Sequence, residues 1–224
     1  MAGKVTALTY QKQRVDRVNV DLDGKFAFGL PDVVAAGLKP GQYLTDADIA
    51  RLRGLDEEQK AYDRAVRFLA YRPRSEAEVR RNLGRAGLDE ELVGRVIERL
   101  REQGYVNDQE FTRFWVENRR QFKPLGARAL RHELRSKGVD EELATAMVED
   151  LDLEELACRA GRPQAQRLKS SLAGNRRDFR SRLAAFLARR GFEYTIIRAA
   201  IARLESELTE GSAGDQVDRS GDVF

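Results

Sequence analysis

The sequence predicts a mainly α-helical protein made of three tandem three-helix repeats, preceded by a small N-terminal β-hairpin module. Three observations lead to this fold class. A glycine surrounded by the same pattern of apolar residues recurs at Gly87, Gly138 and Gly191. Residues that cap helices stand where the helices of each repeat are expected to begin. Only the first segment of the chain alternates between apolar and polar residues, as half-buried strands do.

Residues 1–55 are predicted to hold the β-hairpin and two short helices. Apolar residues alternate with polar ones over Val18–Leu22 and again over Phe26–Phe28. The dipeptide Asp23-Gly24 lies between these runs, and Asp-Gly favours the two-residue turn that joins paired strands. Lys4–Gln11 is expected to add a third strand.

Two short helices complete this module. Pro31 suits the first position of a helix, because its fixed φ is helical and its missing N–H is not needed there. Gly37 and Pro40-Gly41 are then expected to interrupt this helix. Thr45 is expected to cap a second helix that runs to about Arg53.

The repeats follow from an alignment on the three glycines. Leucine precedes each glycine by four residues, and an apolar residue followed by an acid comes directly after it. Apolar residues spaced by four, five and eight lie on one face of a helix. The glycine suits the turn that ends one helix, and the acid suits the cap of the next. The matched apolar positions before and after the glycines are Val79, Leu83, Leu92, Ile97 and Leu100; Leu130, Leu134, Leu143, Val148 and Leu151; and Leu183, Leu187, Ile196, Ile201 and Leu204.

Capping residues set the domain boundaries. Repeat 1 is predicted over residues 56–107, repeat 2 over 108–151 and repeat 3 over 152–208, with a disordered tail over 209–224. Ser75 and Glu78 resemble a capping box, Asn107 or Asp108 suits the start of repeat 2, and Asp152 with Glu155 suits the start of repeat 3. Gly161-Arg162-Pro163 is expected to kink or break the first helix of repeat 3.

Composition argues against catalysis. Cys158 is the only cysteine and His132 the only histidine, so disulfide frameworks, Cys-based zinc sites and His–His metal pairs are excluded. We expect His132 to lie on a helix surface, and we expect no catalytic residue, metal or cofactor. Without an apolar run near 18 residues or a signal-peptide pattern, we predict a cytoplasmic protein with no membrane span.

The charge is distributed unevenly. Residues 56–100 are balanced, residues 101–155 are acidic, and residues 156–208 contain 12 Lys or Arg against 4 Asp or Glu. Such an excess suits contact with a polyanion or an acidic protein surface. The alternative is that the arginine-rich helix faces are simply exposed to solvent and bind no partner.

Three stretches resemble a known family, the RecX regulators of the bacterial recombinase RecA. They are residues 68–83, FLAYRPRSEAEVRRNL; residues 104–119, GYVNDQEFTRFWVENR; and Gly126 followed by residues 130–138, LRHELRSKG. The resemblance covers roughly residues 57–207, and the hairpin module resembles an extension of the longer members. Repeat 3 departs most, at Gly161–Pro163 and in a longer loop around Gly174-Asn175.

The resemblance implies an elongated crescent of repeats, acting as a monomer in the groove of the RecA–DNA filament. There it would lower the ATPase, strand-exchange and co-protease activities of RecA and so regulate DNA repair and recombination. The repeats themselves favour a long surface that can follow a filament. The basic third repeat also suits contact with single- or double-stranded DNA. The alternatives are a direct DNA-binding protein, since helix–turn–helix units resemble DNA-binding modules, and a scaffold for another partner.

The candidate contact residues are exposed-face cations, and none is expected to be catalytic. Val79, Leu83 and Ala86 are taken as the buried face of one helix, with the arginines around them directed outward. Phe111 and Trp115 are expected in the core, and Tyr71 and Tyr105 in the core or an interface. The candidates are Arg72, Arg74, Arg80, Arg81 and Arg85 in repeat 1; Arg119, Arg120 and Lys123 in repeat 2; and Arg176, Arg177, Arg180, Arg182, Arg189 and Arg190 in repeat 3.

Overall fold

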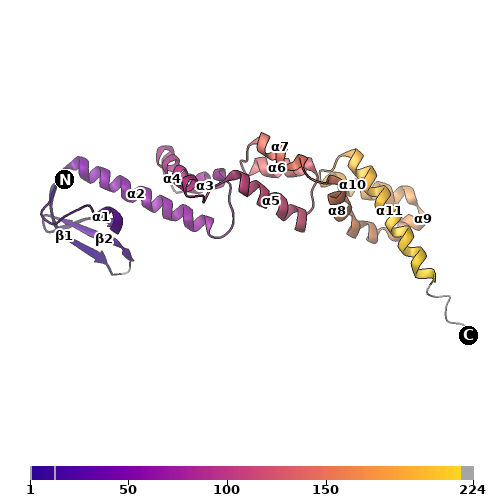
Figure 1. The fold of residues 1–224 in the computed structure, drawn as a ribbon, viewed down its shortest axis with the longest axis horizontal. Helices are drawn as coiled ribbons and strands as arrows, with labels where there is room; N and C mark the ends of the chain where they lie inside the picture. Colours follow the sequence, from indigo (N-terminus) through magenta and orange to yellow (C-terminus); the bar gives the residue numbers. More distant parts are fainter. Residues whose placement is uncertain (1, 13, 218–224) are drawn as a thin grey trace, which may run out of the picture. The chain divides into compact units, whose positions relative to one another are not determined.

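The structure, a computed structural model, describes residues 2–12 and 14–217 (Figure 1). It divides into two compact units. Unit 1 holds the residues up to Arg74 together with Glu78–Val106, and unit 2 holds Ser75–Ala77 together with the residues from Asn107 onward. Within the described residues, no helix combines the length and the apolar character needed to cross a membrane.

An antiparallel sheet opens unit 1. Its strands are β1 (Gly3–Gln11), β2 (Arg14–Leu22), β3 (Lys25–Pro31) and β4 (Tyr43–Leu44), in the spatial order β3-β2-β1-β4. Asp23-Gly24 joins β2 to β3 with φ angles of 48° and 78°, which confirms the predicted hairpin. The predicted third strand is β1. The sequence did not reveal β4, because two residues are too short to show an alternation.

Two helices follow the strands of unit 1. The predicted short helix is α1 (Asp32–Ala35). Pro31 is its N-cap and the last residue of β3, rather than the first helical residue as predicted, because its ψ angle of 144° is extended. Helix α2 (Asp46–Leu69) is capped by Thr45 through the reciprocal hydrogen bonds of a capping box. The expected end near Arg53 was wrong, because α2 continues to Leu69 and also serves as the leading helix of repeat 1. Gly54 weakens such a helix by only about 1 kcal/mol, and no proline follows to end it.

An ion pair and a small core hold α2 against the sheet. The Nη2 atom of Arg17 on β2 lies 2.7 Å from the Oδ1 atom of Asp56 on α2, and both side chains are largely buried. Arg17 also donates to the carbonyl oxygen of Gly29 on β3. The apolar core beneath them contains Val5, Val20, Leu30, Leu44, Ile49 and Leu52.

Repeat 1 combines the second half of α2 with α3 (Glu76–Gly84) and α4 (Glu90–Glu102). Val79 and Leu83 are fully buried, as predicted. Ala86 is exposed, which corrects the expected buried face. Helix α3 ends at Gly84, so the helical spacing that would have placed Ala86 beside Leu83 no longer applies.

Repeat 2 is a three-helix domain at the start of unit 2. Its helices are α5 (Asp108–Phe122), α6 (Ala127–Ser136) and α7 (Glu141–Glu149). The Asn107 side chain accepts hydrogen bonds from the first turn of α5, and the Asp140 side chain does so for α7. Acceptors at these positions satisfy backbone N–H groups that have no partner inside the helix, which explains where both helices begin.

Repeat 3 contains one helix more than predicted. Its helices are α8 (Leu153–Arg167), α9 (Lys169–Gly174), α10 (Arg176–Arg189) and α11 (Tyr194–Val217). The extra helix α9 occupies the stretch expected to be a longer loop. Helix α11 extends into the segment 209–224 that was expected to be disordered, and the remainder of that segment lies outside the described residues.

Helix α8 runs through Gly161 and Pro163, so the predicted break does not occur. Gly161 is buried, and a Cβ atom there would lie 2.9 Å from the Cδ1 atom of Leu204 and 3.5 Å from that of Leu183. The glycine therefore lets α11 and α10 pack closely on α8. Pro163 lies on the exposed side of the helix, where water can reach the backbone carbonyl that loses its hydrogen-bond donor.

The matched glycines have positive φ angles, 80° at Gly87 and 83° at both Gly138 and Gly191. Gly138 and Gly191 directly follow the C-caps of α6 and α10, as predicted. Gly87 does not, because α3 already ends at Gly84 and Gly87 belongs to the turn that follows.

Gly191 also lies at the junction between repeats 2 and 3. The backbone N–H of Gly126, before α6, donates to the carbonyl oxygen of Arg190 at 2.9 Å. A Cβ atom on Gly126 would lie 2.2 Å from the carbonyl oxygen of Gly191. The two repeats therefore meet backbone to backbone.

Candidate partner-binding surface

The predicted contact residues divide between the two units. Arg72, Arg74, Arg80, Arg81 and Arg85 belong to unit 1, and the other nine belong to unit 2. Many of these cations have carboxylate or aromatic neighbours within their own repeat. The local geometry therefore separates arginines that stabilise a repeat from arginines whose charge remains exposed on its surface.

The two arginines before α3 are part of the packing of repeat 1. The Nη2 atom of Arg72 lies 2.9 Å from the Oε1 atom of Glu78. The guanidinium carbon of Arg74 lies 4.1 Å from the centroid of the Phe68 ring, and only 17% of the Arg74 side chain is exposed. Burial lowers the pKa of Arg74. Arg74 is thus a stacked and largely covered cation and is a poor candidate for contact with a partner.

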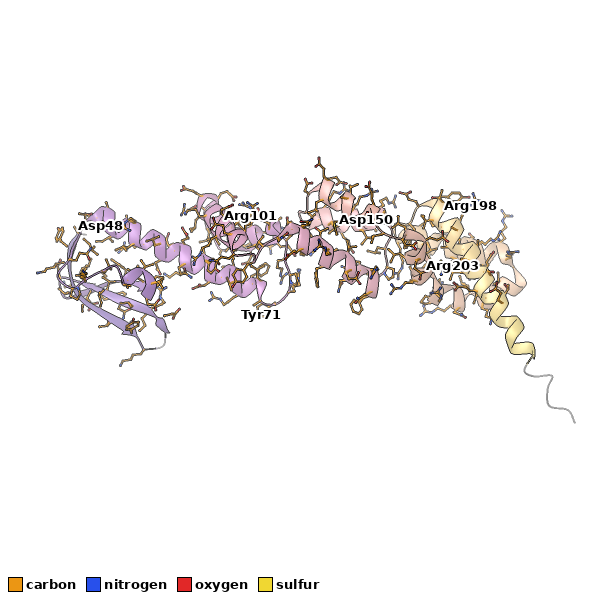
Figure 2. The ribbon with its side chains drawn as sticks, viewed as in Figure 1. Asp48, Tyr71, Arg101, Asp150, Arg198 and Arg203 are labelled. Atoms are coloured by element: carbon orange, nitrogen blue, oxygen red, sulfur yellow. The ribbon has the colours of Figure 1, made fainter. Side chains whose placement is uncertain are left out.

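The arginines of α3 and its following turn are more accessible. Arg80 is half-buried and lies 2.8 Å from Glu90 at the start of α4. Arg81 and Arg85 are exposed. Tyr71, in the loop after α2, is 86% exposed (Figure 2), and Tyr105 is 53% exposed, so neither tyrosine belongs to the core.

In repeat 2, one of the three candidate cations is part of a polar cluster around Trp115. The Nε atom of Arg119 lies 2.6 Å from the Oε2 atom of Glu133, which also accepts from the Trp115 ring nitrogen at 3.0 Å. The Arg119 guanidinium stacks 4.2 Å above the Trp115 ring. Phe111 is buried and Trp115 half-buried against the same core, as predicted. Arg119 therefore helps to hold the Trp115 ring in place within repeat 2.

The other two cations of repeat 2 remain accessible. Arg120 is exposed and pairs with Glu117, one turn earlier on α5, at 2.8 Å. The Lys123 side chain is 59% exposed, and its Nζ atom lies 4.0 Å from Glu133. Such surface pairs contribute little to stability, and a partner with a well-placed carboxylate or phosphate can replace them.

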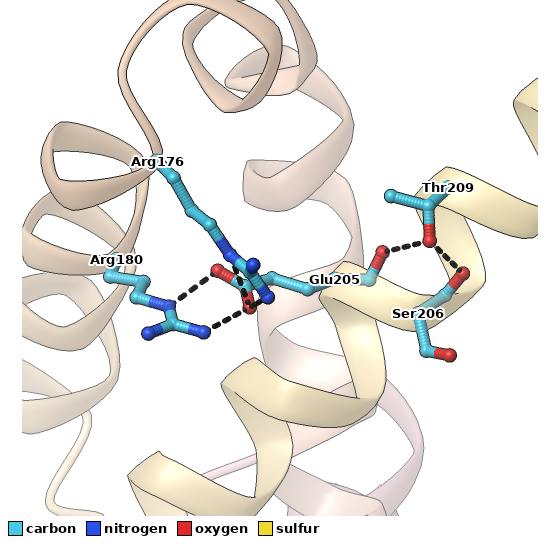
Figure 3. Close-up of polar contacts among 5 residues, drawn as sticks. All are labelled: Arg176, Arg180, Glu205, Ser206 and Thr209. Atoms are coloured by element: carbon cyan, nitrogen blue, oxygen red, sulfur yellow. Dashed lines mark hydrogen bonds and ion pairs between the residues drawn. The ribbon is translucent and has the colours of Figure 1, made fainter.

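In repeat 3, a buried carboxylate holds two of the candidate arginines (Figure 3). Glu205 on α11 is 3% exposed. The Nε and Nη2 atoms of Arg180 lie 2.7 Å and 2.6 Å from the two Glu205 oxygens, a bidentate pair. Arg176 also donates to the Oε2 atom at 2.9 Å. One buried negative charge thus fixes two half-exposed positive charges on the surface of α10.

These donors determine the ionisation of Glu205. Hydrogen bonds from Arg180 and then from Arg176 outweigh the effect of burial and lower the pKa of Glu205 from 4.5 to about 2. Glu205 therefore stays charged at neutral pH. Because one carboxylate faces two guanidinium groups, the cluster keeps a net positive charge.

The remaining candidates of repeat 3 differ in their roles. Arg182 pairs with Asp178 on the same helix at 3.0 Å. The Nη1 atom of Arg190 donates to the carbonyl oxygen of Pro124, and its guanidinium stacks 4.7 Å from the Phe186 ring centroid, so Arg190 belongs to the junction with repeat 2. Arg177 and Arg189 are exposed and are the accessible cations of this group.

Two functional candidates were missed by the sequence analysis. Tyr194 and Arg198 lie one turn apart at the start of α11, where Figure 2 labels Arg198. The Arg198 guanidinium carbon lies 5.9 Å from the Tyr194 ring centroid. Together with Arg177 and Arg180 of α10, they line a groove of about 530 Å³. An aromatic residue followed by arginine at a spacing of four was the available signal, because such a pair shares a helix face.

Comparison with known proteins assigns the chain to a family. Residues 3–45 match the Regulatory protein RecX N-terminal domain. Residues 61–100, 107–147 and 155–201 match the first, second and third three-helix domains of RecX. These matches confirm the predicted fold class, with the hairpin module now seen as a four-stranded sheet.

Individual relatives agree with this assignment. Regulatory protein RecX of Bacillus subtilis (strain 168) is 33% identical over 208 residues, which are 92% of this chain and 79% of that protein. The protein of the same name from Listeria monocytogenes (serovar 1/2a, strain EGD-e) is 26% identical, over 92% of this chain and 77% of its own length.

Solved structures agree as well. A crystal structure of regulatory protein RecX superposes with a TM-score of 0.74 at 25% identity, over 88% of this chain and 97% of that one. RecX from Lactobacillus salivarius shares the fold, with a TM-score of 0.61 over 67% of this chain and 97% of its own. The chain therefore belongs to the RecX family of regulatory, non-enzymatic proteins.

Proposed function

We propose that this chain regulates the RecA recombinase by binding in the groove of the RecA–DNA filament. There it lowers the ATPase, strand-exchange and co-protease activities of RecA. The observation that carries the proposal is the match to all three RecX three-helix domains and to the N-terminal domain along one chain. A filament groove is long and repetitive, and tandem repeats suit such a surface.

The contact residues of this proposal are the candidates whose charge remains exposed. They are Arg81 and Arg85 in repeat 1, Arg120 and Lys123 in repeat 2, and Arg176, Arg177, Arg180, Arg182 and Arg189 in repeat 3, with Arg198 added from the groove. Arg74 and Arg119 have stacking roles inside their repeats, and Arg190 binds across the junction between repeats 2 and 3. Substituting any of them therefore tests folding as much as binding.

The test is the DNA-dependent ATPase of the matched recombinase under conditions that form filaments. We expect protein present at less than one copy per recombinase subunit to slow ATP hydrolysis, because one bound regulator affects a filament of many subunits. Hydrolysis that remains unchanged up to equal concentrations would contradict the proposal. A heat-denatured sample of the same protein controls for buffer components and salt.

A second candidate function is direct DNA binding through repeat 3. Its support is the excess of 12 Lys or Arg over 4 Asp or Glu in residues 156–208. This function requires tight binding to single- or double-stranded DNA without recombinase, with an affinity that falls steeply as salt is raised. A gel shift that is weak at moderate salt would rule it out. If neither the ATPase nor the gel shift responds, the scaffold alternative remains.

A further inference from the structure

The groove between α10 and α11 combines an apolar floor with a cationic rim. Ile197 and Ile201 are largely buried beneath it, and Ala184 and Ala202 complete the floor. Arg177, Arg180 and Arg198 surround it, and Tyr194 is 73% exposed beside them. No acidic residue is among those that line the groove. Its volume of about 530 Å³ lies in the range of pockets that hold ligands.

The Glu205 cluster gives part of this rim a fixed geometry. Arg180 uses its Nε and Nη2 atoms to bind Glu205, so its guanidinium plane is held while its Nη1 group is not engaged by that carboxylate. A guanidinium that is already oriented loses less entropy when it binds a second carboxylate.

A second groove meets the first at the same cluster. It has a volume of about 520 Å³ and is lined by Arg176, Glu205, Ser206 and Thr209, with Ala202 common to both grooves. The two grooves follow α11 from Tyr194 to Thr209, a length of about 22 Å at 1.5 Å per helical residue. An extended peptide of about seven residues spans that distance.

We propose that the two grooves together bind an acidic peptide segment of a partner protein. One apolar side chain of the peptide, placed between its carboxylates, lies in the first groove, which Arg177, Arg180 and Arg198 surround. The apolar side chain lies on the isoleucine floor, where burial of apolar surface favours it. The carboxylates pair with the arginines, which bind them bidentately. The inference goes beyond recombinase regulation, because it names the chemistry that one surface of the third repeat recognises.

A nucleic acid fits this groove less well. Single strands bind along a continuous cationic track with several aromatic rings on which successive bases stack. The groove offers one ring, Tyr194, and a floor of aliphatic side chains. An aliphatic floor suits a Leu or Phe side chain better than a phosphate backbone. A phosphate that contacts apolar surface loses part of its hydration, which costs free energy.

The experiment measures fluorescence anisotropy of a labelled peptide of about seven residues, made of Asp and Glu around one central Phe, a length set by the two grooves together. A matched peptide with Ser in place of Phe carries the same charge. The full-length protein is compared with R177E/R198E, which removes two rim cations. The control variant R159E/R167E makes the same change in charge on exposed residues of α8 that do not line the groove.

We expect the Phe peptide to bind, and R177E/R198E to weaken it roughly tenfold or more, as loss of charge-assisted hydrogen bonds does. The Ser peptide should bind several-fold more weakly, and R159E/R167E should leave binding nearly unchanged. Equal binding of the two peptides, or an equal effect of the two variants, would overturn the proposal. So would an oligothymidine of matched charge that binds more tightly with the same dependence on R177E/R198E. The assay contains no recombinase, so its outcome is separate from that of the ATPase test.

Discussion

At the scale of single residues, a buried acid arranges the basic surface of the third repeat. The sequence shows Arg176 and Arg180 as two members of a cationic run, and Glu205 as one acid far along the chain. The fold brings the carboxylate under both guanidinium groups, at 2.6–2.9 Å for the shorter contacts. Spacing along the sequence did not reveal this cluster, because its members are on different helices.

Glu205 makes the stability of repeat 3 depend on pH. Its pKa is lowered from 4.5 to about 2, so the stabilisation is present above pH 4.5 and is lost as the pH falls through about 2. We expect E205Q to lower the free energy of unfolding at pH 7 by up to about 3 kcal/mol, from 1.36 kcal/mol per pKa unit. The difference from the wild type should shrink as the pH approaches 2.

Urea unfolding followed by circular dichroism at pH 7, 4 and 2.5 measures this difference. E149Q, which neutralises an exposed carboxylate at the end of α7, is the matched control and should change stability little at any of these pH values. A gap between E205Q and the wild type that is constant over the whole range would show that the carboxylate is not the source of the effect.

Cys158 reports on the packing of the same repeat. Its side chain is fully buried in the core of repeat 3, and burial raises the pKa of the thiol. Because the thiolate is the reactive form, we expect Cys158 to react with a disulfide reagent only after repeat 3 opens. The labelling rate should rise with urea in step with the loss of helical signal. Rapid, complete labelling in native buffer would contradict the packing of α8 against α11.

At the scale of helices and strands, the sequence predicts elements well where the signal is local. The Asp23-Gly24 turn, the Thr45 cap and the helix-ending glycines Gly138 and Gly191 act within a few residues, and each was confirmed. The errors arose where distant segments decide the outcome. Gly161-Arg162-Pro163 was expected to kink or break the helix, but α8 continues through these residues. Its packing against Leu204 of α11, which comes close to Gly161, could not be seen in the local sequence. The groove was missed because it forms between two helices.

The junction between repeats 2 and 3 gives a prediction at this scale. We expect G126A to lower the stability of unit 2 by about 1–3 kcal/mol, because the added Cβ would meet the Gly191 backbone, which must shift. The φ angle of Gly126 is −75°, which alanine adopts readily, so no backbone strain contributes.

Gly94 provides the matched control for that substitution. It lies within α4, and a Cβ atom there meets nothing within 4 Å. G94A should therefore raise stability by up to about 1 kcal/mol through helix propensity. Thermal unfolding of both variants measures the two effects. If G126A is as stable as G94A, the backbone contact at the junction is not close.

At the scale of the whole chain, three repeats of one design carry different charges. The acids of repeat 3 are largely committed to particular arginines: Asp178 to Arg182, Glu205 to Arg176 and Arg180, and Glu207 to Arg162. The excess positive charge is therefore carried by the cations outside these pairs, which include Arg177 and Arg198. Composition predicts the excess, whereas the fold determines which cations display it.

We propose that these exposed cations of repeat 3 carry the contact through which the protein regulates the recombinase. The most direct measurement is the concentration of protein that halves filament ATPase, compared among the wild type, R177E/R198E and R159E/R167E. We predict that R177E/R198E requires roughly tenfold more protein, as the loss of charge-assisted contacts implies, while R159E/R167E behaves as the wild type. Half-inhibition at the same concentration for all three proteins would contradict the claim.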